Sequence, residues 1–589
     1  MTSTLADIVV QNAQRDPGRV VVSRREGGAW QPVTAAAFAE QVAEVALGFV
    51  AAGVGSGDRV ALMARTRYEW TLVDAALWAA GAVTVPVYET SSAEQLRWIL
   101  ADSGAVGAVV ETKAQAAKLA ALAGDAPDLR ASWAMDDDAG LPTLADLVAN
   151  GRGQDPVELE RRRSALSPES LATIIYTSGT TGRPKGCELT HGNFLAEVTG
   201  AIETLPELFE DPDGATLLFL PLAHVFGRMV QVAVLLAGVR FGHSDVARIT
   251  TDLPTFRPTF VLAVPRVFER VFDTAQRKAA TAGKERIFAL AAETAVAYSK
   301  ALDDGRPGPL LRLRHSVFDR LVYGKLKAAF GGETEWAISG GAALGPRLGH
   351  FFRGIGITVL EGYGLTETTA ATTVNTRAGT RIGTVGRPLP GVEVRIGPDG
   401  EVLVRGAHVF TGYWRNPEAT ADVLDSDGWL HTGDLGSLDD DGYLTITGRA
   451  KEILVTSSGK NVSPAPLEDV LRSHVLVSQA MVLGDGRSSI AALLTVDAES
   501  VASWLEQSER PPAPVPDLVE DPALLAELRT AVDAANATVS SAEQIKRFRV
   551  LPVDFTEDSG HLTPTMKLKR AAVMKDFARD IEVLYGTRG

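Results

Sequence analysis

A loop rich in glycine and threonine, placed directly after an apolar segment, most strongly constrains how this chain can fold. Residues 171–176 (LATIIY) have the length and β-branched content of a buried strand. Residues 177–186 then read TSGTTGRPKG, and a helix is expected to begin near residues 190–193. Glycines let backbone N–H groups turn toward one point, the hydroxyls add donors, and Lys185 adds a positive charge. This combination predicts a polyphosphate-binding loop at the end of a strand.

Two other interpretations of this loop fit less well. The common G-x-x-x-x-G-K-[ST] loop does not match, because Pro184 stands where the second glycine should be and Gly186 follows Lys185. A cluster of Gly, Ser and Thr by itself is more often an ordinary surface turn. Here the cluster follows a predicted buried strand, and the ordered string TSGTTG-x-PKG is long. We therefore interpret the segment as a phosphate-binding loop.

The chain is long enough for several domains. A length of 589 residues exceeds what one hydrophobic core usually supports, so at least two domains are expected. Helical and strand-like segments alternate, which predicts an α/β fold with mainly parallel sheets covered by helices. Expected helices lie at 35–52, 70–80, 266–300 and 310–330, and expected strands lie at 59–64, 82–87, 215–222 and 259–264.

From about residue 382 the pattern changes to short alternating segments between Gly, Pro and Asp turns. These predict a β-barrel-like, β-rich subdomain at about 382–449, followed by a compact α+β unit. The expected domains are therefore an N-terminal domain at 1–449 and a small C-terminal domain at 450–589. In the latter, helices are expected at 466–473 and 524–540, strands at 478–483 and 491–497, and an exposed Pro-rich loop at 509–517.

Charge and cysteine content exclude several classes of protein. A net charge of −15 and a pI near 5.2 argue against a nucleic-acid-binding surface. The single cysteine, Cys187, excludes a disulfide framework and a cysteine-based zinc site, and we interpret it as a packing residue. The charge runs at 136–138 and 161–163 are interpreted as solvated surface. No secretory signal is recognised, and the apolar runs are shorter than the ~20 residues of a spanning helix, so a cytoplasmic protein is expected.

A second glycine-rich motif, GYGLTE, occupies residues 362–367. Glycines on both sides of Tyr363 allow a flat ligand to lie against its ring, and Glu367 offers a hard oxygen ligand for magnesium. The alternative is a turn at a strand end with a solvated glutamate. The motif alone favours neither interpretation.

A third motif combines WLHTGD at residues 429–434 with GRAKEI at residues 448–453. Asp434 can accept both hydroxyls of a ribose, and Arg449 can bridge the same sugar or a phosphate. An aspartate at such a turn is, by itself, more often a simple cap.

Two further segments carry candidate site residues. Residues 562–570 (LTPTMKLKR) place Lys567 in a basic stretch, which taken alone is more often the start of a tail helix. His224, in the string LPLAHVFGR, follows a predicted strand and is either a pocket residue or a satisfied core histidine.

Taken together and in this order, these motifs resemble those of the adenylate-forming superfamily, which includes acyl-CoA synthetases, adenylation domains and firefly-type luciferases. The resemblance extends from about residue 10 to Lys567 and is closest to bacterial long-chain fatty acid–CoA ligases. It implies ATP, coenzyme A and a fatty acid as ligands, Mg²⁺ as cofactor, and a mobile C-terminal domain. In such enzymes a fatty carboxylate attacks the α-phosphorus of ATP, and the thiol of coenzyme A then displaces AMP from the acyl adenylate.

The resemblance also implies roles for individual residues. Tyr363 is expected to pack on adenine, with residues 340–342 on the other side of the base, and Lys451 is expected to be the hinge of the C-terminal domain. The expected catalytic residues are Lys567, Lys185, Glu367 and His224, and the expected metal contacts are Glu367 and Thr180. The implied ATP and AMP contacts are Thr177, Ser178, Gly179, Thr180, Thr181, Gly182, Lys185, Gly340, Gly341, Ala342, Glu361, Gly362, Tyr363, Gly364, Thr366, Asp434, Arg449 and Lys567.

One departure and several alternatives accompany this interpretation. Many relatives have glycine just before the catalytic lysine, whereas this chain has Met566. Other functions to consider are a fatty acyl-AMP ligase that loads a carrier protein, a catalytically inactive adenylate-binding protein and a luciferase-like oxygenase. The sequence leaves open the acyl chain length, the oligomeric state (monomer or homodimer) and peripheral contact with a membrane.

Overall fold

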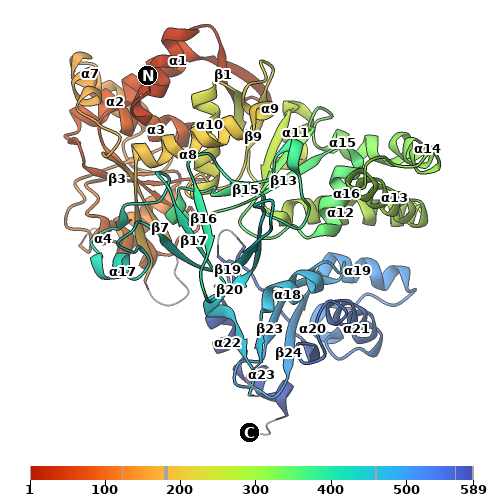
Figure 1. Cartoon of the computed structure of the whole chain (residues 1–589). Helices are drawn as coiled ribbons and strands as arrows, with labels where there is room; N and C mark the ends of the chain where they lie inside the picture. The colour runs from red at the N-terminus through yellow and green to blue at the C-terminus, as the bar shows by residue number, and fades with distance from the viewer. Residues whose placement is uncertain (1, 123, 178–182, 458–459, 564–565, 587–589) are drawn as a thin grey trace.

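The computed structural model describes residues 2–122, 124–177, 183–457, 460–563 and 566–586. The chain forms a large N-terminal part and a smaller C-terminal part, coloured blue in Figure 1, which lies against one end of the larger part. Among the described residues, no helix combines the length and the apolar character needed to cross a membrane.

A seven-stranded sheet carries the two ends of the phosphate-binding loop. Its strand order is β18-β8-β7-β4-β3-β5-β6, in which the last five strands are parallel and β18 and β8 are antiparallel to their neighbours. The strands are β3 (Arg59–Met63), β4 (Val83–Val87), β5 (Gly107–Val110), β6 (Ala131–Ala134), β7 (Leu171–Thr177), β8 (Lys185–Thr190) and β18 (Gly412–Tyr413). The carboxyl ends of the parallel strands therefore share one edge.

A nine-stranded sheet forms the other half of the N-terminal part. Its order is β15-β14-β13-β12-β11-β9-β10-β1-β2, parallel from β13 to β1 and antiparallel at both margins. The strands are β1 (Val20–Glu26), β2 (Ala29–Thr34), β9 (Ala215–Leu218), β10 (Arg240–His243), β11 (Phe260–Ala263), β12 (Trp336–Ser339), β13 (Thr358–Tyr363), β14 (Thr373–Val374) and β15 (Arg387–Pro388).

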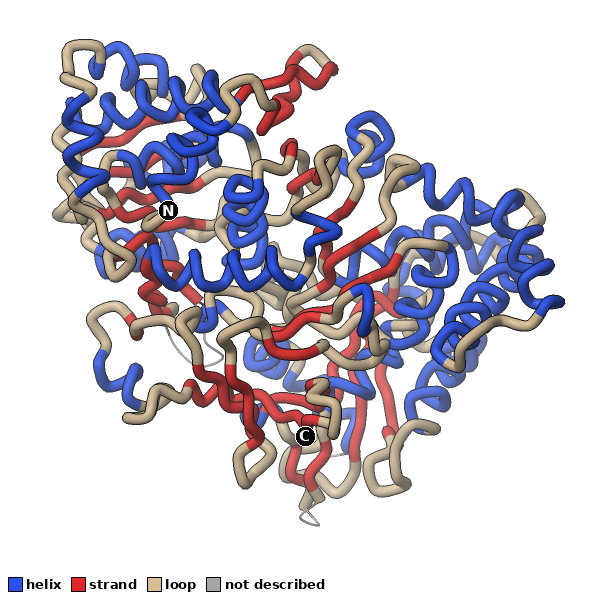
Figure 2. Tube along the Cα trace, turned by 45° about the horizontal axis from the view of Figure 1, so that its top comes forward, coloured by secondary structure: helices blue, strands red, loops and turns tan. Residues whose placement is uncertain are grey.

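Helices surround the strands of the N-terminal part, as Figure 2 shows. On β3, Val60 and Leu62 face one hydrophobic core and Ala61 and Met63 face another, so both faces of this sheet are covered, as the sequence predicted. The helices are α1 (Leu5–Arg15), α2 (Ala35–Ala51), α3 (Tyr68–Ala79), α4 (Ala93–Ser103), α5 (Lys113–Ala120), α6 (Leu144–Gly151), α7 (Val157–Ser164), α8 (His191–Thr204), α9 (Pro206–Phe209), α10 (Val225–Ala237), α11 (Ile249–Phe256), α12 (Pro265–Thr281), α13 (Glu285–Asp303), α14 (Pro309–Phe318), α15 (Gly324–Ala329), α16 (Pro346–Ile355) and α17 (Pro417–Ala421).

The predicted β-rich subdomain is a four-stranded antiparallel sheet of order β16-β17-β19-β20. Its strands are β16 (Glu393–Ile396), β17 (Glu401–Arg405), β19 (Leu430–Leu438) and β20 (Leu444–Arg449). Val402, Val404 and Leu444 form its small core, and Tyr363 from the end of β13 packs against them. This contact places the small sheet beside the end of the nine-stranded sheet.

The C-terminal part is a three-stranded sheet with helices on both faces. Along β24, residues 490, 492, 494 and 496 enter one core and residues 491 and 493 the other, which explains why the whole strand is apolar. Its elements are β21 (Leu454–Val455), β22 (Asn461–Val462), α18 (Pro464–Arg472), β23 (Val477–Leu483), β24 (Ile490–Val496), α19 (Ala498–Gln507), α20 (Val515–Leu518), α21 (Pro522–Asn536), β25 (Ile545–Val550), α22 (Arg570–Asp576) and α23 (Ala578–Tyr585).

Four predicted segments differ from the structure. The helix expected at 266–300 is two helices, α12 and α13, separated at residues 282–284, where Gly283 has a φ of +67°. The helix expected at 310–330 is α14, a π-helical turn η1 (Asp319–Tyr323) and α15. The strand expected at 215–222 ends at Leu218, and the end of the expected loop at 509–517 belongs to α20.

The two charge runs are more than solvated surface, which corrects that expectation. Arg162 donates to two backbone carbonyl oxygens of neighbouring elements, at 2.8 and 2.9 Å, and Arg163 pairs with Asp7 of α1. Asp136 accepts a hydrogen bond of 2.8 Å from Arg67. These side chains tie separate elements of the N-terminal part together.

Candidate active site

The candidate active site lies where strand ends from both large sheets meet a loop of the C-terminal part. Thr177 ends β7 and Tyr363 ends β13, and both strands end at the carboxyl edge of their sheets, where open α/β folds bind ligands. Lys567 reaches the same place from the C-terminal part, close enough for its charge to interact with Glu367, Asp434 and Arg449. The structure thus brings together most of the residues that the motifs predicted.

The two described ends of the phosphate-binding loop are fixed by neighbouring elements. Thr177 and Lys185 are partners across β7 and β8. Trp98 of α4 donates its indole N–H to the carbonyl oxygen of Pro184 at 2.8 Å, and the Arg183 guanidinium lies 4.7 Å from the centre of the Trp98 ring. The predicted contacts Ser178, Gly179, Thr180, Thr181 and Gly182 lie outside the described residues.

Cys187 follows this loop and is fully buried, which confirms that it is a packing residue. Burial raises the pKa of its thiol well above the ordinary value, and the negative charge of Glu367 raises it further. The thiol is therefore held in its protonated form.

Lys185 and Glu367 are linked through Tyr413, a residue that the sequence did not single out. The Lys185 ammonium lies 4.8 Å from the centre of the Tyr413 ring, and the Tyr413 hydroxyl donates a hydrogen bond of 2.8 Å to Oε1 of Glu367. Burial, followed by the charge of Glu367, raises the pKa of Tyr413, so this hydroxyl remains a donor. Tyr413 lies in the short strand β18, which pairs with β8, and no local sequence pattern marks it.

Tyr363, Asp434 and Arg449 form a second cluster. The Tyr363 hydroxyl donates to Oδ2 of Asp434 at 2.8 Å, and Nε of Arg449 donates to Oδ1 of the same carboxylate at 2.8 Å. Asp434 and Arg449 face each other across β19 and β20. Burial and the charge of Asp434 hold the pKa of Tyr363 well above its usual value. Each oxygen of the buried Asp434 keeps a second lone pair for a ligand hydroxyl.

Two glycines among the predicted ATP contacts have little room for a side chain. A Cβ on Gly364 would lie 1.4 Å from the carbonyl oxygen of Ala370, and a Cβ on Gly340 would lie 3.1 Å from the Phe226 ring. Gly341 has a φ of +85°, in the left-handed region that favours glycine. Gly341 and Ala342 are exposed, so this short turn is open to a ligand.

The three remaining predicted contacts are Glu361, Gly362 and Thr366, and Gly362 pairs with Val374 across β13 and β14. Glu361 is buried, and its Oε1 accepts a hydrogen bond of 2.9 Å from the backbone N–H of Leu344, while burial raises its pKa to about 7. Thr366 begins the short 3₁₀ turn η2 (Thr366–Thr368), which also contains Glu367.

His224 is the N-cap of α10. Its Nδ1 accepts a hydrogen bond of 3.2 Å from the backbone N–H of Phe226. Burial, followed by the positive charge of Lys567, lowers the pKa of His224 to about 3. The ring is therefore neutral at physiological pH, and it lies close enough to Lys567 to be affected by its charge.

Lys567 projects from a tight turn in which the N–H of Thr563 bonds to its carbonyl oxygen at 2.8 Å. The Lys567 side chain is exposed to solvent. Loss of hydration among the surrounding residues, followed by the positive charge of Arg449, lowers its pKa below the ordinary lysine value. Asp434 and Glu367 oppose this shift. Met566, directly before the lysine, has a φ of +63°, a conformation that glycine adopts without strain.

The expected hinge lies at the passage between the two parts. Lys451 is in the short turn η4 (Ala450–Glu452), directly after β20. On the other side of the C-terminal part, Arg277 of α12 donates to Oγ of Ser500 at 3.0 Å and pairs with Oδ1 of Asp497 at 3.3 Å. Arg347 of α16 donates to the backbone carbonyl oxygen at the end of α18, at 3.3 Å. These contacts hold the C-terminal part in the orientation that points Lys567 into the site.

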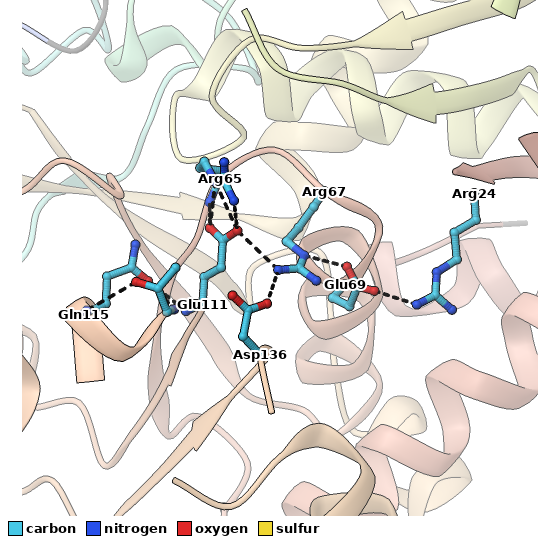
Figure 3. Close-up of polar contacts among 8 residues, drawn as sticks. Arg24, Arg65, Arg67, Glu69, Glu111, Gln115 and Asp136 are labelled. Atoms are coloured by element: carbon cyan, nitrogen blue, oxygen red, sulfur yellow. Dashed lines mark hydrogen bonds and ion pairs between the residues drawn. The ribbon is translucent and has the colours of Figure 1, made fainter. Parts of the chain in front are cut away.

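A network of charged residues borders the strand ends of the seven-stranded sheet and was not predicted (Figure 3). Arg65, after β3, makes hydrogen bonds of 2.7 and 3.0 Å with Oε1 of Glu111, which follows β5. Arg67 contacts both Glu111 and Glu69, and Glu69 accepts from Arg24 of β1 at 2.8 Å. The network therefore joins the two large sheets, and its signal in the sequence was the alternation of charged residues at 65, 67 and 69.

The described ranges contain no group of three or more His, Cys, Asp or Glu side chains arranged to hold a metal ion. Glu367 nevertheless fits a magnesium ion, because it is a partly exposed carboxylate with one oxygen oriented by Tyr413. The remaining ligands of such an ion would be phosphate oxygens and water.

Solved structures with the same fold bind adenylates. The A domain of carboxylic acid reductase from Segniliparus rugosus, in complex with AMP and a co-purified carboxylic acid, matches with a TM-score of 0.78 and 20% identity over 99% of this chain and 94% of that structure. The anthranilate CoA ligase AuaEII, in complex with anthranoyl-AMP, matches with a TM-score of 0.72 and 19% identity over 97% of both chains. The fold is thus that of the adenylate-forming enzymes.

The chain belongs to the AMP-binding enzyme family. The model for the AMP-binding enzyme matches residues 9–414, and the model for the AMP-binding enzyme C-terminal domain matches residues 451–589. A protein of Mycobacterium bovis named long-chain-fatty-acid–CoA ligase FadD15 is 52% identical over 99% of this chain and 97% of its own length. The peroxisomal long chain acyl-CoA synthetase 7 of Arabidopsis thaliana is 33% identical over 90% of this chain and 78% of its own length.

Proposed function

We propose that the protein is an AMP-forming long-chain fatty acid–CoA ligase. The observation that carries the chemistry is the position of Lys567, which comes from the C-terminal part and lies among Glu367, Asp434 and Arg449. A cation delivered by a separate unit suits a reaction that needs positive charge at one stage and its withdrawal at the next. The choice of a long-chain acid rests on the names of the relatives.

In the first half-reaction, a carboxylate oxygen of the fatty acid attacks the α-phosphorus of ATP, and pyrophosphate leaves. Lys567 would hold the carboxylate and the α-phosphate together, and Lys185 with the donors of the phosphate-binding loop would bind the outer phosphates. Asp434 would accept the ribose hydroxyls, and Tyr363 would pack on adenine. Mg²⁺, held by Glu367 and the phosphates, would neutralise negative charge on the phosphates of ATP. Neutral His224 would border the carboxylate without adding a charge.

In the second half-reaction, the thiol sulfur of coenzyme A attacks the carbonyl carbon of the acyl adenylate, and AMP leaves. We propose that Lys567 withdraws before the thiol enters, because the C-terminal domain, residues 450–589, turns about Lys451 relative to residues 1–449. The turn breaks the contacts of Arg277 and Arg347 with the C-terminal part, which are polar and few.

We further propose that the protein acts in the cytoplasm and contacts a membrane only peripherally. Long-chain fatty acids partition into membranes, so such a ligase gains access to its substrate at a membrane surface. No nucleic acid is expected as a partner.

Release of AMP should depend on ATP, coenzyme A and a fatty acid, and should be measured with acids of increasing chain length. We expect the highest rates with long-chain acids. Product formation with a carrier protein but not with coenzyme A would instead identify a fatty acyl-AMP ligase. If no acid drives exchange of label between pyrophosphate and ATP, the proposal is wrong.

A further inference from the structure

Helices α13 and α14 form the outer edge of the N-terminal part, at the right in Figure 1. Four large apolar side chains of α14 and η1 are exposed there, with exposed fractions between 48% and 78%: Leu310, Leu313, Val317 and Leu321. Their spacing of three and four residues places them on one side of the helix, and we call them the apolar stripe. Ile287 and Leu290 of the neighbouring α13 are also exposed, by 44% and 47%.

The orientation of the apolar stripe is fixed by contacts on the inner side of α14. His315 stacks on Tyr298 of α13 with ring centres 3.9 Å apart, and its Nε2 bonds to the carbonyl oxygen of Gly354 at 2.7 Å. These contacts hold the helix against α13 and α16 and turn the stripe outward. Single exposed apolar residues are ordinary, but a row of four on one helix marks an interaction surface.

The charge around the apolar stripe has the opposite sign to that of the whole chain. Residues 306–327 contain six Arg or Lys and one Asp, whereas the chain has a net charge of −15. The one acid, Asp319, is paired with Lys327 at 2.8 Å. The exposed Arg314 and Arg320 lie on either side of the stripe by helical spacing. The surface therefore combines apolar side chains with unneutralised positive charge.

From these observations we infer that the apolar stripe and its flanking arginines dock the protein on an anionic lipid membrane. A helix with an apolar face bordered by arginines lies in the plane of a membrane interface, with the arginines contacting acidic headgroups. The inference deepens the proposed function, on which it rests, because the membrane would be the source of the fatty acid.

The docking surface is rigidly connected to the wall of the candidate active site. α13 packs so closely on α16 that a Cβ on Gly354 would lie 2.1 Å from the carbonyl oxygen of Ala295. α16 in turn follows the turn that contains Gly340 and precedes β13. α16 is thus the element that connects α13 with the turn at Gly340.

Sedimentation of the full chain with vesicles tests this inference directly. Without ATP or coenzyme A, the protein should sediment with vesicles that contain phosphatidylglycerol, weakly with pure phosphatidylcholine, and less as salt increases. The double variant Leu310→Ser/Leu313→Ser should lose more than roughly ten-fold in affinity, since each buried leucine contributes about 1.5–3 kcal/mol. Arg320→Gln should lose about five-fold, since one basic side chain near an anionic surface contributes about 1 kcal/mol.

Two matched variants serve as controls. Val157→Ser removes an apolar side chain that is 67% exposed on α7, and Arg152→Gln removes an exposed arginine, and both should bind vesicles as the wild type does. The inference is overturned if the wild type stays in the supernatant with phosphatidylglycerol, or if Leu310→Ser/Leu313→Ser binds normally. It is also overturned if that variant converts a dimer into a monomer without lipid, because the surface would then bind a second copy.

Ligase activity on fatty acid dispersed in detergent separates this inference from the proposed function. The variants of the apolar stripe should form acyl-CoA there at the wild-type rate, because the stripe lies outside the site. An inactive wild type in that assay would disprove the proposed function, and the vesicle result would stand by itself.

Discussion

The hydroxyl of Tyr413 donates a hydrogen bond of 2.8 Å to Oε1 of Glu367, while the face of the same ring receives the ammonium of Lys185 at 4.8 Å. One side chain therefore positions both the expected ligand of magnesium and the expected ligand of the outer phosphates. Tyr413 is a positioning residue, because it reaches the nucleotide only through these two partners.

Tyr413→Phe should raise the Mg²⁺ concentration needed for exchange of label between pyrophosphate and ATP. A hydrogen bond to a charged group contributes about 1.5–3 kcal/mol, so we expect a shift of roughly ten-fold or more. The ring remains, so binding of ATP should change little. Tyr413→Leu, which also removes the contact with Lys185, should weaken ATP binding in addition. An unchanged magnesium titration for Tyr413→Phe would contradict the role of Glu367 as well.

Lys567→Ala should abolish adenylation and leave the formation of acyl-CoA from synthetic acyl adenylate nearly intact. Equal loss of both half-reactions would exclude the role assigned to this lysine. The pH dependence gives a second measurement. Because the pKa of Lys567 is lowered in the folded protein, its positive charge is lost at a pH below the ordinary lysine pKa of 10.5. Adenylation should therefore decline as pH rises through this lowered pKa, before arginine or ordinary lysine residues titrate.

Arg277→Ala should slow adenylation and spare the second half-reaction, because Arg277 contacts Ser500 and Asp497 only in the orientation that points Lys567 into the site. The loss should be modest, at most about five-fold, since a partly exposed pair contributes up to about 1 kcal/mol. Rapid-quench measurement of each half-reaction separates the two effects. Arg270→Ala, on the same helix, is the matched control and should leave both rates unchanged.

Lys451→Pro should have the opposite effect, because it stiffens the passage between the two parts. Adenylation should proceed, and transfer to coenzyme A from a preformed acyl adenylate should be blocked. A normal second half-reaction in this variant would remove Lys451 from the hinge.

Met566→Gly should stabilise the C-terminal part. A residue with a side chain at a φ of +63° is strained by about 1–2 kcal/mol, and the greater freedom of glycine in the unfolded chain offsets about 0.5–1 kcal/mol of this. We expect a net gain of up to about 1 kcal/mol in the free energy of unfolding, measured by denaturant titration. Met566→Ala keeps the strained backbone and should give no gain, so equal stabilisation by both variants would refute the explanation.

Much of the fold could be predicted because local signals and tertiary structure agree. The apolar segment 171–176 is β7, and the helix expected near residues 190–193 begins at His191, where Thr190 and Asn193 form a reciprocal cap. The break between α12 and α13 was missed, because Gly283 lies in a helix-forming context and its positive φ is not encoded by periodicity.

The site was only partly predictable, for a different reason. Motifs identify residues that touch a ligand, and the residues of each motif are adjacent or nearly adjacent in the sequence. Tyr413 and Glu111 act on residues 46 positions away in the chain, Glu367 and Arg65, so no local pattern marks them. His224 and Glu361 were recognised as site residues, but their backbone partners follow only from the folded geometry.

The bridge from Arg24 through Glu69 and Arg67 to Glu111 restricts the movement of the two large sheets relative to each other. It fastens the margin of the nine-stranded sheet to the carboxyl edge of the seven-stranded sheet. Neither sheet can slide on the other without separating the buried Glu111 and the half-buried Glu69 from their arginines. A covalent crosslink between the two sheets should thus leave turnover intact. A crosslink that joins α12 to α19 should instead allow one acyl adenylate to form and block its transfer to coenzyme A.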